Sequence, residues 1–129
     1  MIIIGLTGSI GMGKTTTAKF FADAGIPVQN ADEVVHVLYQ GDGAALIEEA
    51  FPNTVINGKV DRQALGKKVL GNKAALKQLE NIVHPLVQKA REEFIEEHKA
   101  KKTPMVLLDI PLLFETGLDK HCDVIVVVS

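Results

Sequence analysis

The residues with the clearest chemical meaning form a glycine-rich segment near the N-terminus. Residues 8–15 read Gly-Ser-Ile-Gly-Met-Gly-Lys-Thr and match the phosphate-binding pattern G-x-x-x-x-G-K-[ST] at Gly8, Gly13, Lys14 and Thr15. Glycines let consecutive backbone N–H groups turn toward an anion, and a helix that begins there adds the positive end of its dipole. Lys14 supplies positive charge to the β- and γ-phosphates, and the Thr15 hydroxyl binds Mg²⁺. The segment therefore predicts a site for a nucleoside triphosphate with Mg²⁺.

The segments on either side of the loop have the properties that this motif requires. Residues 1–6 are an apolar run suited to a strand buried on both faces, and residues 15–24 place apolar side chains at helical spacing before Gly25. A strand, a glycine-rich turn and a helix in this order favour a phosphate site over a turn without a ligand. The residues expected to contact ATP are Gly8, Gly11, Met12, Gly13, Lys14, Thr15 and Thr16.

The composition limits the classes of function. Of the 129 residues, 47% are hydrophobic, which fits a buried-sheet α/β protein, and 14 basic and 16 acidic side chains give a net charge of −2. This balance gives no electrostatic reason to expect nucleic acid or an anionic membrane as a partner. The single cysteine, Cys122, cannot form an internal disulfide, and the sequence shows no signal peptide and no run of transmembrane length. We therefore expect a cytoplasmic protein that binds neither nucleic acid nor membrane.

Short apolar runs and amphipathic segments alternate along the rest of the chain. Further strands are expected at residues 26–30, 105–109 and 123–128, and helices at 31–39, 44–51, 63–70 and along 76–94. Pro85 should kink or restart the last helix, Asp61 should cap the one before it, and Asn57-Gly58 indicates a turn.

Strands separated by helices imply right-handed crossovers and a parallel sheet. We expect an α/β fold of the P-loop nucleoside triphosphate hydrolase type, in three layers, with helices on both faces of the parallel sheet. A helical insertion over about residues 31–100 separates the second and third strands. Residues 1–129 should form a single domain.

Two aspartates follow expected strands, at the edge where open parallel sheets bind their ligands. Asp109 comes directly after four apolar residues. In P-loop proteins, the acidic residue that holds Mg²⁺, directly or through water, follows an apolar strand in the same way. The alternative is an ordinary aspartate that caps a turn. Asp32 could orient and deprotonate an acceptor hydroxyl, or it could cap the helix that follows. We favour the metal role for Asp109 and the catalytic role for Asp32.

The histidines do not indicate a metal site. His36, His84, His98 and His121 have spacings that match no zinc pattern, and His121-Cys122 has no further ligands nearby in the sequence. His84 stands before Pro85, where a packing or hydrogen-bonding role is the simplest interpretation.

Taken together, these segments resemble the dephospho-CoA kinase family. Residues 3–15 are similar to that family's phosphate loop, and Ala31-Asp32 matches the end of its Asp-Ala-Asp segment. Three more blocks follow in the family's order: Gly58 to Arg62 with Leu65, Leu79-Glu80 with His84-Pro85, and Leu108 to Glu115. The loop alone would fit any P-loop protein, whereas the other blocks are specific and extend the resemblance over nearly the whole chain.

The resemblance implies that ATP phosphorylates the 3′-hydroxyl of dephospho-CoA to give coenzyme A and ADP, the last step of coenzyme A synthesis. Lys14 and Asp32 would then be catalytic, and Thr15 and Asp109 would bind Mg²⁺. The acceptor would be bound by Asp32, His84, Pro111, Leu112 and Leu113, with the helical insertion around the pantetheine arm. The alternatives are another small-molecule or nucleotide kinase, and an ATP-binding module without catalysis.

The sequence departs from the family pattern at two points. Asn30 replaces the first aspartate of Asp-Ala-Asp, and an amide can hydrogen-bond but cannot act as an anionic base. Family members also continue beyond the strand that ends at Ser129, with an arginine-bearing lid, an adenine pocket and a further strand. The two arginines here, Arg62 and Arg91, lie in expected helices away from the strand ends. We therefore expect this chain to correspond to the N-terminal portion of such a kinase.

Overall fold

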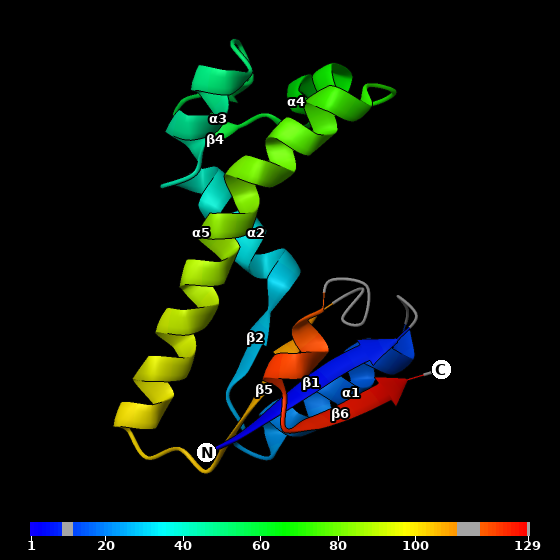
Figure 1. Ribbon diagram of the computed structural model, residues 1–129, viewed down its shortest axis with the longest axis vertical. Coiled ribbons are helices and arrows are strands. Elements are labelled where there is room, and N and C mark those ends of the chain that lie inside the picture. The colour runs from blue at the N-terminus through cyan, green and yellow to red at the C-terminus, as the bar shows by residue number, and fades with distance from the viewer. Residues whose placement is uncertain (9–11, 111–116, 129) are drawn as a thin grey trace. The chain divides into compact units, whose positions relative to one another are not determined.

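The chain folds into two compact units (Figure 1). The structure is a computed structural model, which describes residues 1–8, 12–110 and 117–128. The first unit, called the sheet unit below, comprises Met1–Asp32 and Arg91–Ser129, and the second, the helical unit, is Glu33–Ala90. The helices α2 (Ala31–Gln40) and α5 (Lys73–Ala100) each contribute residues to both units.

The sheet unit is built on four parallel strands in the order β2-β5-β1-β6. Their bounds are β1 (Ile2–Gly8), β2 (Val28–Asn30), β5 (Met105–Asp109) and β6 (Val124–Val128). Asp109 pairs with Leu6 on one side and with Asn30 on the other. The parallel sheet is therefore confirmed, and the carboxyl ends of β1, β2 and β5 meet at one edge.

Helices cover both faces of this sheet. On one face, Ala18 and Phe21 of α1 (Met12–Asp23) pack on a core of Ile4, Leu6 and Leu107. On the other, Phe94 and Ile95 of α5 and Leu118 of the short 3₁₀ helix η1 (Leu118–His121) pack on Leu108 and Ile110. The two cores arise because side chains alternate across a strand, so that Leu107 and Leu108 face opposite layers. The expected three-layer α/β fold is confirmed.

The helical unit has a hydrophobic core of its own. It contains the rest of α2, then α3 (Ala44–Ala50), α4 (Arg62–Val69) and the first part of α5. This core is a cluster of the buried side chains Ile47, Phe51, Leu65 and Leu79. The unit lies between β2 and β5 in the chain, where a helical insertion is expected. Whether both units act as a single domain stays a prediction.

Three local features of this unit compare directly with the sequence. Asp61 caps α4 as expected, because its Oδ1 accepts hydrogen bonds from the N–H groups of Gln63 and Ala64. Asn57-Gly58 forms the expected turn, with positive φ at both residues. This turn joins two strands absent from the sequence-based assignment, β3 (Val55–Ile56) and β4 (Lys59–Val60).

Of the two effects expected at Pro85, a restart of the long helix is wrong, and a kink stays a prediction. α5 continues through Pro85 from Lys73 to Ala100. Proline removes a hydrogen bond to the carbonyl four residues earlier, here that of Asn81, and an exposed carbonyl can bind water instead. Asn81 and Pro85 are both exposed, so the helix can lose this bond without leaving an enclosed carbonyl.

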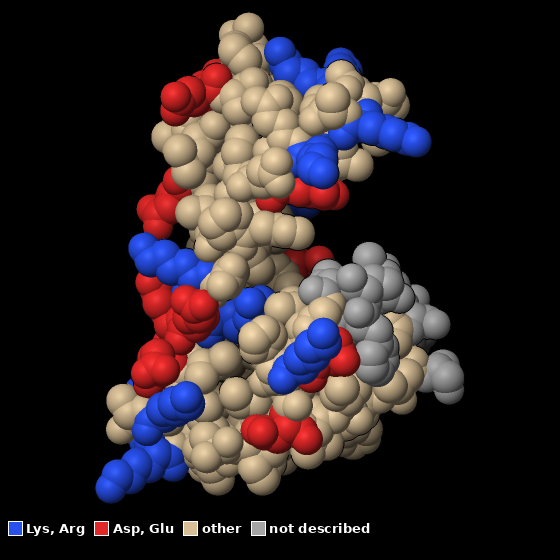
Figure 2. Space-filling model, in the orientation of Figure 1, with Lys and Arg blue, Asp and Glu red and all other residues tan. Residues whose placement is uncertain are grey.

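Two surface properties of the described residues bear on possible partners. The helices in these ranges are either too short or too polar to span a bilayer. Figure 2 shows lysine, arginine, aspartate and glutamate side chains mixed on the face that is drawn.

Candidate functional site

The end of β1 brings two backbones very close together. Gly8 has a φ of 139° and pairs with Val128 of β6, and a Cβ at Gly8 would overlap the Val128 carbonyl oxygen. Only glycine can therefore stand where β1 ends. The sequence motif assigns Gly8 to phosphate binding, and the close approach of Val128 adds a second reason for glycine at this position. Gly11, the other loop glycine before α1, lies outside the described residues.

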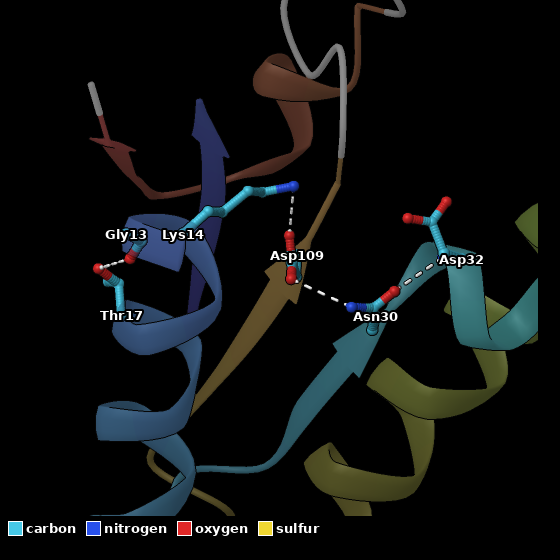
Figure 3. Close-up of polar contacts among 6 residues, drawn as sticks. All are labelled: Gly13, Lys14, Thr17, Asn30, Asp32 and Asp109. Atoms are coloured by element: carbon cyan, nitrogen blue, oxygen red, sulfur yellow. Dashed lines mark hydrogen bonds and ion pairs between the residues drawn. The ribbon is translucent and has the colours of Figure 1, made fainter. Parts of the chain in front are cut away.

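The lysine of the loop motif, Lys14, is paired with the aspartate that ends β5. Lys14 Nζ lies 2.6 Å from Asp109 Oδ1, and the two side chains are 10% and 7% exposed. Figure 3 shows the Lys14 side chain reaching from the first turn of α1 to the end of β5. The structure therefore brings together two residues that the sequence assigned separately to phosphate and to Mg²⁺.

The Asp109 carboxylate can accept a metal ion. Its Oδ1 is buried and forms an ion pair with Lys14. Within the described residues, this oxygen accepts no hydrogen bond. Such an anionic oxygen is the type of ligand that Mg²⁺ prefers, and Mg²⁺ is usually held by one or two carboxylates together with substrate phosphates. The residues present therefore fit an ATP-linked Mg²⁺ ion, for which Asp109 and Thr15 are the candidate ligands.

A third polar residue, Asn30, links the two aspartates. Its Nδ2 donates a hydrogen bond of 3.2 Å to Asp109 Oδ2, and its Oδ1 accepts one of 2.9 Å from the Asp32 N–H (Figure 3). Since α2 begins at Ala31, Asn30 is the N-cap of that helix. The sequence-based site did not include Asn30, although an asparagine directly before a helix is a strong capping signal.

Asp32 is not the residue that caps α2. It is the second residue of the helix, and its side chain is exposed. Figure 3 shows its carboxylate pointing away from Asn30. The capping alternative for Asp32 is therefore wrong, because Asn30 performs that role, and the catalytic role stays a prediction.

The other predicted ATP contacts lie at the start of α1. Met12 is the first residue of the helix, and Gly13, Thr15 and Thr16 follow in its first turns, with exposed side chains for the two threonines. Thr17 Oγ1 donates a hydrogen bond of 2.8 Å to the Gly13 carbonyl, so that threonine is engaged within the helix. The positions of these residues agree with phosphate binding, and their individual roles stay predictions.

The other expected acceptor-binding residues fall into two groups. His84 is exposed on α5 within the helical unit. Pro111, Leu112 and Leu113 lie outside the described residues. Their roles in acceptor binding stay predictions.

The parallel sheet, the glycine-rich sequence motif at residues 8–15 and the Lys14–Asp109 pair define a P-loop protein. Two solved structures share the fold: TT1252 from Thermus thermophilus (TM-score 0.81, 37% identity, 99% of this chain and 65% of that one) and dephospho-CoA kinase from Campylobacter jejuni (TM-score 0.81, 28% identity, 98% and 65%). The model of the dephospho-CoA kinase family matches residues 2–129. The chain belongs to this family.

Curated relatives agree with that assignment. All 129 residues align with dephospho-CoA kinases from Bradyrhizobium diazoefficiens, at 58% identity, and Agrobacterium fabrum, at 56%. The chain spans 65% and 66% of the length of these two relatives.

Proposed function

We propose that the protein is an ATP-dependent kinase that phosphorylates the 3′-hydroxyl of dephospho-CoA. The observation that carries this proposal is the arrangement at the carboxyl edge of the sheet: Lys14 pairs directly with Asp109, and Asn30 bonds both the Asp109 carboxylate and the Asp32 N–H. Family membership supports the choice of acceptor. We further infer that the protein acts in the cytoplasm on these two small-molecule substrates.

The chain's own residues divide the reaction between them. Lys14 would exchange its partner Asp109 for phosphate oxygens and so offset the charge that develops during transfer. Asp32 would accept the proton of the 3′-hydroxyl as the new bond from oxygen to the γ-phosphorus forms and the bond to the ADP oxygen breaks. Asp109 and Thr15 would hold Mg²⁺, which neutralises phosphate charge when it is bound.

Acceptor-dependent formation of ADP tests this proposal. The intact protein is incubated with ATP, Mg²⁺ and one of three acceptors: dephospho-CoA, a nucleoside monophosphate or pantetheine. ADP is followed by a coupled assay and the product by mass spectrometry. We expect ADP and a phosphorylated product with dephospho-CoA alone. Turnover of the monophosphate instead would indicate a nucleotide kinase, and ATP binding without transfer to any acceptor would indicate a binding module.

A further inference from the structure

We propose that Asn30 is a positioning residue of the phosphotransfer site. Its amide nitrogen fixes the Asp109 carboxylate, and its amide oxygen fixes the start of α2, which carries Asp32. One side chain thereby sets the positions of the group assigned to Mg²⁺ and the group assigned to the acceptor. The inference rests on the proposed function, because the roles of both aspartates come from it.

The contact with Asp109 determines which oxygen the carboxylate offers to cations. Asn30 and Asp109 are paired residues of adjacent parallel strands, and the amide N–H donates to Oδ2 at 3.2 Å. The other oxygen, Oδ1, is thereby left for the Lys14 ammonium group at 2.6 Å. A hydrogen bond to a charged acceptor is stronger than one between neutral groups, so it can hold the carboxylate while the partner of Oδ1 changes.

The contact with Asp32 determines where α2 begins. Asn30 Oδ1 accepts the hydrogen bond of the Asp32 N–H at 2.9 Å, which satisfies one of the N–H groups left free at a helix start. Asp32 is one turn or less from this cap, so loss of the cap would let its backbone fray. The exposed Asp32 carboxylate depends on this backbone contact for a fixed position.

The two contacts together require an amide. An aspartate at position 30 could accept from the Asp32 N–H but, when ionised, could not donate to Asp109. It would also place a second carboxylate beside Asp109, a residue that is only 5% exposed. Asn30, which cannot act as an anionic base, is thus suited to both hydrogen bonds.

Two variants separate the contacts. Asn30→Ser keeps a good capping oxygen but has a side chain too short to reach Asp109, whereas Asn30→Ala removes both contacts. The matched control is Asn72→Ser, because Asn72 caps α5 in the helical unit through a 3.0 Å hydrogen bond from the Ala75 N–H. The intact protein carries each substitution. Hydrogen exchange of the Asp32 amide reports the cap, calorimetry reports the Kd of a non-hydrolysable Mg²⁺–ATP analogue, and steady-state assays give kcat and both KM values.

We expect Asn30→Ser to retain slow exchange at Asp32 but to raise the Kd for the analogue by about tenfold, the size of effect for one hydrogen bond to a charged group. The KM for ATP should rise while the KM for dephospho-CoA stays within about twofold of the wild type. Asn30→Ala should show the same loss of analogue affinity together with faster exchange at Asp32, and a lower kcat than Asn30→Ser. The control should leave all these values unchanged.

The proposal would be overturned if Asn30→Ser had the same Kd for the analogue and the same KM for ATP as the wild type, because Asn30 would then be only a helix cap. A wild-type protein that binds the analogue but does not phosphorylate dephospho-CoA would contradict the proposed function alone, and the Kd values would still decide the role of Asn30 toward Asp109. A wild-type protein that does not bind the analogue would overturn both.

Discussion

The ammonium group of Lys14 lies 2.6 Å from the Asp109 carboxylate, so a buried ion pair joins the phosphate loop to the end of β5. Both residues are enclosed, at 10% and 7% side-chain exposure. An enclosed pair depends on both members, since removal of one leaves the other without a partner. The pair therefore connects the stability of the sheet unit with the proposed triphosphate site.

Replacement of the lysine should affect both properties. Lys14→Ala is expected to lower the free energy of unfolding by about 2 kcal/mol, because the Asp109 carboxylate is left unpaired, and to raise the Kd for ATP at least tenfold. Urea unfolding and calorimetry measure the two effects. Lys19→Ala, an exposed lysine of the same helix, serves as the control and should change neither. The double variant Lys14→Ala/Asp109→Asn should be more stable than Lys14→Ala alone. If the loss of stability in the double variant equals the sum of the losses in the two single variants, the two side chains are not coupled.

Asp32→Asn should slow phosphoryl transfer rather than weaken acceptor binding. Loss of a general base lowers turnover by roughly 10²–10⁴-fold, and the KM for dephospho-CoA should change by less than about threefold. Because Asn30 caps α2, the fold should lose only the small interaction of a carboxylate with a helix N-terminus, on the order of 0.5 kcal/mol. Steady-state kinetics and thermal unfolding provide the measurements. Asp42→Asn, in the exposed turn after α2, is the control, and a normal kcat for Asp32→Asn would remove the catalytic assignment.

Gly8→Ala should lower the free energy of unfolding far more than the same change at another glycine with positive φ. A methyl group at Gly8 overlaps the backbone of β6 at Val128, whereas at Gly25, with a φ of 85°, it would meet no atom within 4 Å. We expect Gly25→Ala to cost about 1–2 kcal/mol, the strain of a left-handed residue, and Gly8→Ala to cost at least twice as much. Thermal unfolding compares the two proteins. Equal losses would mean that only the backbone conformation matters at Gly8.

Cys122 should react slowly with alkylating agents. Burial raises the pKa of its thiol above the ordinary value of 9.0, with further contributions from Asp119 and Asp123. The Sγ–H also contacts the Leu118 carbonyl, which requires the protonated form. Because the folded state favours the neutral thiol, its contribution to stability is complete below the pKa of the unfolded thiol and is lost as the pH rises toward the higher folded value.

Two measurements check this expectation. Iodoacetamide should modify the folded protein severalfold more slowly at pH 8 than the urea-unfolded protein, in which the thiol is an ordinary one. Between pH 8 and 10 the melting temperature should fall more steeply for the wild type than for Cys122→Ala, which has no thiol to ionise. Equal slopes would show that the environment of Cys122 does not disfavour the thiolate.

Much of the sheet unit could be predicted from the sequence, because its signals are local. The apolar runs around Ile4, Leu107 and Val126 are each long enough to mark a buried strand, and the glycine-rich motif marks where the first strand ends and its helix begins. The helical unit was less completely predicted. β3 and β4 have two residues each, too few for any periodicity, so only their turn could be recognised.

The contacts of the site could be predicted only in part. Lys14 and Asp109 were both recognised by local pattern, but their pairing depends on β5 lying beside β1, which is a relationship between distant segments. Asn30 was missed as a linking residue for the same reason. Its role toward Asp109 follows from the register of β2 against β5, which cannot be read from either segment alone.

The separation between the core of the helical unit and the two cores of the sheet unit has a consequence for cooperativity. Ile47, Phe51, Leu65 and Leu79 pack with neighbours from within the helical unit, whereas the sheet is stabilised by other side chains. Segments with separate cores can open as separate units, with different free energies. We therefore expect slow amide exchange in β1 and β5 to persist while Glu33–Ala90 opens, and Lys14 to stay paired with Asp109 through those openings.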